Sequence, residues 1–201
     1  MSAEYKIPDE FLNSPREEEI TKDEYYMALA EIAAKRSPDP STQVGVCYVS
    51  KDGEVLSLGY NHPPKRWKGP FIWNRETKTK DGDEIDPFFT KYPYIIHAEV
   101  DGIKEVDYEG STCYVTLFPC SNCAKMIENK GITRVVYLHM GNINYTDVKS
   151  SLYLLQNSGI EVVSFDDIKR EEYEGLELNV DPEVKDNVKI VKRSLTPQFD
   201  K

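Results

Sequence analysis

The spacing of apolar residues predicts a helix near the start of the chain. Thr21 and Glu24 form a T-x-x-E capping box, in which each side chain bonds the backbone of the other residue. The apolar residues that follow recur at helical spacing and keep to one face: Tyr26, Leu29, Ala30 and Ala33. Pro38 and Pro40 cannot continue a helix, so we expect this one to end near Ser37.

A hairpin and a long irregular segment follow this helix. Residues 43–50 and 54–60 have strand character, and the turn sequence Lys51-Asp52-Gly53 between them is typical of a hairpin. Residues 61–93 are rich in proline, lysine and aromatic side chains and show no clear period. A loop of this length inside a compact domain is usually either functional or disordered.

Beyond residue 93, short helices alternate with short β-branched strands. We expect helices at 97–106, 120–130 and 147–158, and strands at 113–117, 133–138 and 161–165. Gly131 and Gly159 each end a helix just before a strand. Helical crossovers between such strands imply parallel pairing and right-handed connections. The pattern predicts one α/β domain: a mixed sheet of about five strands, antiparallel at its first pair, with helices on both faces.

The length of the chain, 201 residues, suits one domain with short tails. We expect an acidic N-terminal leader over residues 1–20 and the domain over residues 21–166. Residues 167–201 are acidic and weakly patterned, and we interpret them as a surface tail with one candidate strand at 188–191.

Composition and charge exclude several classes of function. No apolar run reaches the ~18–20 residues that a membrane span needs, and the acidic N-terminus lacks the apolar stretch of a signal peptide, so we expect a cytoplasmic protein. The formal net charge of −10 works against broad binding to nucleic acids or anionic membranes. Residues 61–80 reverse this trend, with a net charge of +5. This basic island suits a small anionic ligand, or it is simply a solvated lysine-rich loop.

Two short motifs carry the candidate chemistry, and each opens an expected helix: His97-Ala98-Glu99 and Pro119-Cys120-Ser121-Asn122-Cys123. One imidazole and two thiolates make a three-ligand zinc site that leaves the fourth tetrahedral position for water, whereas a structural zinc site normally has four protein ligands. The remaining candidate ligands are scattered: His62, His139, Cys47 and Cys113. Cys47 and Cys113 lie in expected strands, where small core side chains are the simpler interpretation. The sequence therefore favours an open zinc site.

The expected helix starts strengthen this interpretation. Amide groups at a helix N-terminus lower thiol pKa values, and a spacing of three places the sulfurs of Cys120 and Cys123 on one first turn. Glu99 lies two residues from His97, where a free carboxylate can move a proton from water to a substrate nitrogen. Taken alone, a C-x-x-C pair is also typical of redox proteins, and H-x-E is common by chance.

Together and in this order, the motifs match H-x-E…P-C-x-x-C, the signature of zinc-dependent nucleobase deaminases. Four further segments resemble the deoxycytidylate (dCMP) deaminase family: Lys35 to Gly45, Gly59-Tyr60-Asn61, Tyr92-Pro93-Tyr94 and Leu117 to Lys125. The resemblance covers roughly residues 22–166. It implies a single-domain, cytidine-deaminase-like three-layer fold with bound Zn²⁺, and it makes residues 61–93 a long active-site loop.

The same resemblance implies hydrolytic deamination of dCMP to dUMP and ammonia by a zinc-activated water, supplying dUMP for thymidylate synthesis. It makes Glu99 the group that protonates N3 and then the leaving amine. It also implies that Asn61 contacts the sugar, that the Ala98 backbone N–H contacts the base carbonyl, and that Tyr145 is an active-site tyrosine. On the residues alone, Asn61 is a turn residue and Tyr145 a partly buried surface ring. Family members are often hexamers regulated by dCTP and dTTP, so we expect a homo-oligomer.

The 5′-phosphate of a mononucleotide needs cations close to the sugar contact. The one dense source near Asn61 is the segment from Lys65 to Arg75. We therefore predict that the long loop folds over the active-site mouth and that Lys65, Arg66 or Arg75 reaches the phosphate.

Two positions depart from the family pattern. His62 replaces the glycine that usually follows Gly-Tyr-Asn, and Asp101 puts a carboxylate where the family has a neutral amide. Other substrates for the same chemistry therefore stay open: a cytidine nucleoside, a modified dCMP, dCTP or a base in nucleic acid. A zinc-stabilised binding module without turnover is disfavoured, because a structural site has no use for Glu99.

Overall fold

Five strands form one mixed sheet in the order β2-β1-β3-β4-β5. A computed structural model describes residues 7–12, 19–141 and 145–171 of the chain. The strands are β1 Gly45–Val49, β2 Val55–Tyr60, β3 Thr112–Leu117, β4 Arg134–His139 and β5 Glu161–Ser164. β1 pairs antiparallel with β2 and β3, whereas β3–β4 and β4–β5 are parallel. The predicted mixed sheet with an antiparallel first pair is confirmed.

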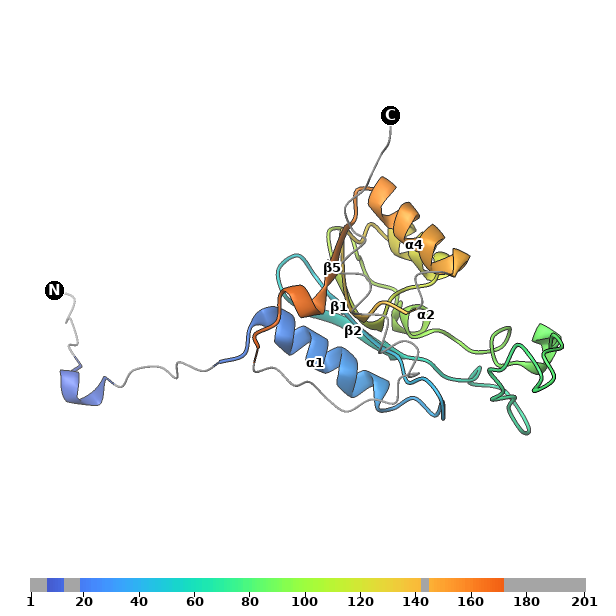
Figure 1. The fold of residues 1–201 in the computed structure, drawn as a ribbon. Helices are drawn as coiled ribbons and strands as arrows, with labels where there is room; N and C mark the ends of the chain where they lie inside the picture. Colours follow the sequence, from blue (N-terminus) through green and yellow to red (C-terminus); the bar gives the residue numbers. More distant parts are fainter. Residues whose placement is uncertain (1–6, 13–18, 142–144, 172–201) are drawn as a thin grey trace, which may run out of the picture.

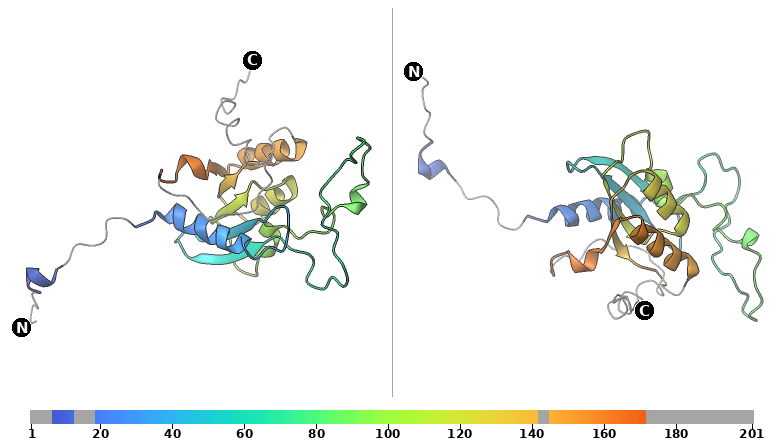
Figure 2. Two further views of the ribbon diagram at one scale, coloured as in Figure 1. Left: turned by 60° about the horizontal axis from the view of Figure 1, so that its bottom comes forward. Right: turned by 90° about the horizontal axis from the view of Figure 1, so that it is seen from above.

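Helices cover both faces of this sheet (Figures 1 and 2). They are α1 Lys22–Ala34, α2 Ala98–Gly102, α3 Ser121–Asn129 and α4 Thr146–Asn157, with 3₁₀ turns η1 Asp9–Phe11, η2 Pro87–Phe89 and η3 Phe165–Asp167. Side chains of α1 pack in one cluster with Cys47, Val49 and Tyr114 of the sheet. Side chains of α2, α3 and α4 pack in a second cluster with their strand neighbours Val46 and Cys113. Alternate residues of each strand thus face opposite helical layers, which makes the fold three-layered.

Cys47 and Cys113 are fully buried and unpaired, one in each of these clusters. Burial raises the pKa of the Cys47 thiol to about 12 and raises the pKa of Cys113 as well. Their predicted role as small core side chains is confirmed.

The predicted capping box starts α1. Thr21 N donates to Glu24 Oε2 at 2.8 Å, and Glu24 N donates to Thr21 Oγ1 at 3.2 Å. The Glu24 carboxylate is fully buried and also accepts hydrogen bonds from the backbone and guanidinium of Arg170, at 2.8 to 3.1 Å. Contacts with the domain therefore continue past residue 166, whereas the candidate strand at 188–191 lies outside the described residues.

α2 is shorter than the predicted helix over 97–106. It ends at Gly102, where an added Cβ would lie 2.7 Å from side-chain atoms of Tyr48 and Val46. The Tyr108 hydroxyl then donates to Gly102 O at 3.2 Å and accepts from Lys104 N at 2.9 Å. Contacts with the sheet and with Tyr108, which no local pattern encodes, turn the chain away from the helix axis.

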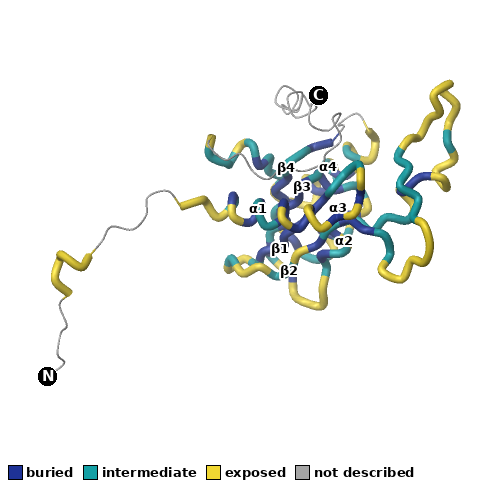
Figure 3. The backbone as a smooth tube through the Cα atoms, turned by 90° about the horizontal axis from the view of Figure 1, so that it is seen from below, coloured by how far each residue is buried: buried dark blue, intermediate teal, exposed yellow. Residues whose placement is uncertain are grey.

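Residues 61–93, called the arm below, extend away from the body of the molecule in every view (Figures 1 to 3). His62 and Ile96 close the root of the arm with two backbone hydrogen bonds, of 3.1 and 2.9 Å. The arm is irregular, as predicted, and its aromatic rings mostly contact each other, as Phe71 contacts Trp67 and Trp73. Most of the arm extends outward from the domain (Figure 1), whereas Lys65 and Lys91, near its two ends, contact Asp101 and Asp39 of the domain.

None of the helices in the described part of the chain has the length and apolar character needed to cross a bilayer.

Candidate metal centre

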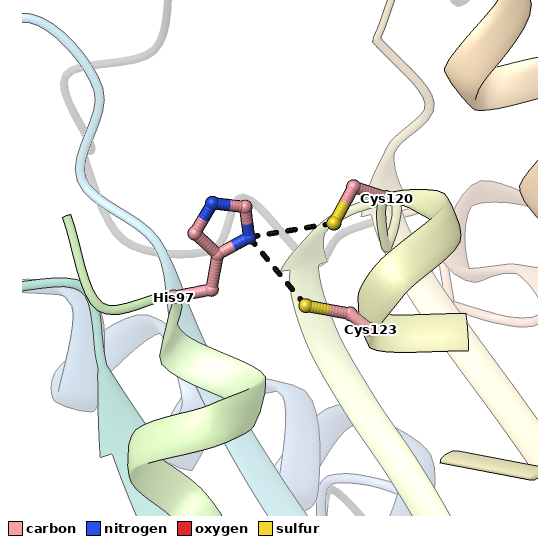
Figure 4. A group of neighbouring side chains, drawn as sticks. All are labelled: His97, Cys120 and Cys123. Carbon is pink, nitrogen blue, oxygen red and sulfur yellow. Dashed lines mark hydrogen bonds between the residues drawn. The ribbon is translucent and has the colours of Figure 1, made fainter. Parts of the chain in front are cut away.

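His97, Cys120 and Cys123 converge at the starts of two helices (Figure 4). His97 is the N-cap of α2, Cys120 is the N-cap of α3, and Cys123 lies in the first turn of α3. His97 Nδ1 is 3.5 Å from the Sγ atom of each cysteine, and the three ligand atoms all lie within 4.8 Å of one another. The three predicted ligands therefore form one cluster.

The sheet explains why α2 and α3 begin side by side. Gly59 on β2 lets α2 lie directly on the strand, because a Cβ there would be 2.3 Å from Gly102 N and 2.4 Å from Ala98 O. The chain enters α3 from the end of β3, where Phe118 N donates to His139 O at 2.7 Å. The backbone on one side of the cluster thus lies on the edge strand β2, and on the other side it follows the central strand β3.

This donor set fits zinc. Zn–S and Zn–N bonds of about 2.3 and 2.0–2.1 Å at a tetrahedral angle place sulfur and nitrogen about 3.6 Å apart. The observed Nδ1–Sγ distances of 3.5 Å agree with that value. Three ligands of this kind would hold a zinc ion and leave one coordination position for water.

Hydrogen bonds among the three side chains shift their pKa values in opposite directions. Hydrogen bonds with Cys123 and His97 lower the pKa of Cys120 to about 4, although burial opposes this shift. The hydrogen bond between His97 and Cys120 raises the pKa of His97 to about 9. A second hydrogen bond, between Cys123 and Cys120, raises the pKa of Cys123, and burial adds to this shift. The two sulfurs and the imidazole therefore share protons that a divalent cation would displace.

Glu99 lies beside the cluster without belonging to the three-ligand group. Its side chain is buried and contacts Cys123, while its backbone oxygen accepts a hydrogen bond from the Tyr48 hydroxyl at 3.0 Å. Burial raises the pKa of the Glu99 carboxyl above its ordinary value. A carboxyl beside the cluster that does not belong to the ligand group is free to take up and release a proton, as a general acid–base requires.

The other predicted site residues lie at different distances from this centre. Ala98 is the fully buried first residue of α2, whose N–H has no acceptor within the helix. Asn61 is buried just beyond β2, and its side-chain amide bonds to Asp39, Thr42 and Val44. Ala98 therefore adjoins the cluster directly, whereas Asn61 belongs to a polar network beside it.

The predicted phosphate ligands are spread along the arm. Lys65 Nζ lies 3.5 Å from Asp101 Oδ1 on α2, although the lysine side chain is 77% exposed. Arg66 is exposed, and Arg75 forms an ion pair of 3.5 Å with the neighbouring Glu76. Of the three, Lys65 is thus the one that the structure ties to the helix carrying Glu99.

Tyr145 is the N-cap of α4, and its side chain is 60% exposed. The first turn of α4 also carries Asp147, whose carboxylate accepts hydrogen bonds from the Ser121 hydroxyl and backbone N–H. Because Ser121 follows the ligand Cys120, the start of α4 lies against the start of α3.

Sequence reasoning missed Asp147, and it also missed the buried pair of Asp39 and Lys91. The sequence predicts only the end of a helix and a family-like segment around Asp39, and an active-site loop around Lys91, with no contact between the two residues. The available signal was the Ser41-Thr42 pair after Asp39, because aspartate followed by such residues commonly caps a turn.

Comparison with known proteins agrees with this site. A family model described as "Cytidine and deoxycytidylate deaminase zinc-binding region" matches residues 20–139. The chain is 36% identical over 150 residues to a probable deoxycytidylate deaminase of Drosophila melanogaster, covering 73% of each chain. It is 39% identical over 127 residues to a deoxycytidylate deaminase of Mus musculus, covering 61% of this chain and 67% of the mouse protein.

A solved structure is also similar. The dCMP deaminase from the cyanophage S-TIM5, crystallised with dCMP and dUMP, superposes with a TM-score of 0.51 at 26% identity, covering 71% of this chain and 95% of that one.

Proposed function

This chain belongs to the cytidine and deoxycytidylate deaminase zinc-binding family, and from that premise we propose that it deaminates dCMP to dUMP with release of ammonia. The observation that carries the proposal is the convergence of His97, Cys120 and Cys123 beside the buried carboxyl of Glu99. The relatives named deoxycytidylate deaminase, and the phage enzyme crystallised with dCMP and dUMP, support this choice of substrate.

The chemistry follows from these four side chains. His97 Nδ1 and the two cysteine Sγ atoms would hold the zinc ion, which supplies Lewis-acid activation of water when bound. The Glu99 carboxylate takes a proton from the attacking water and delivers it to N3 of the cytosine ring. After the hydroxyl adds at C4, Glu99 takes the second proton from this new C4 hydroxyl and passes it to the amine, so the C4–N bond breaks, ammonia leaves and the C4 carbonyl of dUMP forms.

The substrate contacts are part of the same proposal. The Ala98 N–H donates to the base carbonyl, and Asn61 contacts the sugar. Lys65 contacts the 5′-phosphate, a choice supported by its ion pair with Asp101 on α2. Tyr145, at the start of α4, is the proposed active-site tyrosine.

An ammonia-release assay over dCMP, dCTP, deoxycytidine, cytosine, guanine and a short single-stranded DNA tests the assignment. We expect dCMP to have the highest kcat/KM and the DNA to be inert, because the net charge of −10 repels a polyanion. A higher kcat/KM for deoxycytidine or for the DNA would reject the mononucleotide assignment while keeping the zinc chemistry.

The assembly and regulation expected from the family resemblance are also proposals. We propose a cytoplasmic homo-oligomer, most simply a hexamer, with dCTP and dTTP as effectors. Light scattering of the purified protein, assays of dCMP turnover with each nucleotide added, and fractionation of expressing cells test these points. An active monomer that ignores both nucleotides would contradict the first two.

A further inference from the structure

A buried ion pair joins the end of the arm to the loop between α1 and β1. Lys91 Nζ lies 2.6 Å from Asp39 Oδ2, and the side chains of the two residues are 6% and 0% exposed. Lys91 Nζ also donates to Ser41 Oγ at 2.7 Å. Removing one partner of such a pair leaves an uncompensated buried charge, which makes the contact costly to break.

The Asp39 carboxylate is saturated with donors. Its Oδ1 atom accepts from Ser41 N, Ser41 Oγ and Thr42 N at 2.9 to 3.1 Å. Its Oδ2 atom accepts from Lys91 and, at 3.2 Å, from the Asn61 side-chain amide. Although burial raises the pKa of Asp39, the hydrogen bonds from Lys91 and the backbone lower it below its ordinary value. The carboxylate is therefore charged at neutral pH and holds Asn61 through a strong acceptor.

These contacts fix which polar function of Asn61 remains for a ligand. Its Nδ2 group donates one hydrogen to Asp39 and the other to Thr42 O, at 3.2 and 2.9 Å. Its Oδ1 atom accepts from Val44 N at 2.8 Å, which uses one of two acceptor positions. Both hydrogens are thus consumed, and the remaining capacity is a single acceptor position on Oδ1.

We propose that Lys91 and Asp39 are positioning residues that hold the Asn61 amide so that it recognises a ligand only as an acceptor. In a deoxyribonucleotide the sugar group that donates to such an acceptor is the 3′-hydroxyl. The inference rests on the proposed function, because it takes Asn61 as the sugar contact. Lys91 lies near the C-terminal end of the arm, so the arm sets the orientation of a residue just beyond β2.

The test compares dCMP with 2′,3′-dideoxy-CMP, which lacks that hydroxyl. The variants are Lys91→Met, Lys91→Arg, Asp39→Asn and Asn61→Ala, with Lys80→Met, an exposed lysine of the same arm, as the matched control. Zinc content and thermal unfolding are measured for each protein, to separate positioning from loss of the fold.

Wild type and Lys80→Met should favour dCMP over the dideoxy analogue by about 10-fold in kcat/KM, the effect of one hydrogen bond. Lys91→Met, Asp39→Asn and Asn61→Ala should lower this ratio toward one while keeping zinc, and Lys91→Arg should restore it in part. A wild-type ratio near one would reject Asn61 as the sugar contact, and no turnover of dCMP would reject the proposed function. A normal ratio in a folded Lys91→Met or Asp39→Asn protein would reject the positioning role alone.

Discussion

His62 Nε2 lies 3.1 Å from Asp101 Oδ1, so the two residues that depart from the family pattern contact each other. Their side chains are 10% and 11% exposed, and Asp101 also accepts from Tyr60 N at 3.3 Å. Burial raises the pKa of Asp101, but the contacts with His62 and Tyr60 N lower it below its ordinary value. The two departures are therefore one coupled change that joins the root of the arm to the helix carrying Glu99.

This contact predicts non-additive mutations. His62→Gly removes one partner of the buried Asp101 carboxylate, and Asp101→Asn replaces the charged acceptor of the contact by a neutral one, so each should destabilise the protein by about 1–3 kcal/mol. The double variant should lose less than the sum of the two, with a coupling energy of about 0.5–3 kcal/mol. Denaturant unfolding of the four proteins at neutral pH measures the cycle, and strictly additive losses would show that the pair does not interact.

The metal centre predicts two classes of variant. Cys120→Ser and Cys123→Ser should lose zinc and activity together, whereas Glu99→Gln should keep zinc and lose about 10²-fold or more in kcat. Measuring both the zinc content and the rate of dCMP turnover of each variant distinguishes the two classes. Cys47→Ala and Cys113→Ala are the controls, because both thiols are buried in the core and should leave zinc content unchanged. Wild-type turnover by Glu99→Gln would contradict the proton-transfer role.

Glu24 predicts an acid-sensitive contribution to stability. Burial raises its pKa, but hydrogen bonds from Thr21 and Arg170 outweigh this and lower it from 4.5 to about 2. A carboxyl whose pKa is lowered by folding stabilises the protein fully above pH 4.5 and loses this contribution as the pH falls toward 2. Thermal unfolding from pH 7 to pH 3 should show a weaker pH dependence for Glu24→Gln. The exposed Glu54→Gln is the control, and an unchanged profile for Glu24→Gln would refute the assignment.

Phosphate recognition predicts a substrate-dependent effect. Lys65→Ala should lower kcat/KM for dCMP about 10- to 100-fold, as loss of one charge-assisted contact implies, and leave deoxycytidine unaffected. Arg66→Ala and Arg75→Ala should have smaller effects, because Arg66 is exposed and Arg75 pairs with Glu76 on the arm. Equal losses with both substrates would indicate damage to the site rather than to phosphate binding.

Local signals in the sequence were sufficient for most of the fold. The Thr21–Glu24 capping box, the Gly53 turn and the helix-ending Gly131 act within a few residues, and each lies where it was predicted. The metal ligands could be predicted for a different reason: their chemistry constrains residue type and spacing even before the fold is known.

Contacts between distant residues could not be predicted in the same way. α2 ends where Gly102 meets Tyr48 and Val46, a restriction that arises only once the helix lies on the sheet. The burial of Lys91 against Asp39 was equally hidden, because a lysine in a polar loop is normally exposed.

The closed root of the arm affects how the length of this segment can change among related enzymes. The chain leaves the domain at His62 and returns at Ile96, and two backbone hydrogen bonds join these residues. Lengthening a loop whose ends are already fixed adds little entropy cost, about 0.6 kcal/mol for each doubling of its length. The exposed turn that the bridge between Lys78 and Glu84 closes is therefore a natural place for insertions and deletions, which would leave the spacing of the metal ligands unchanged. Enzymes that share this centre are free to differ most in the segment next to it.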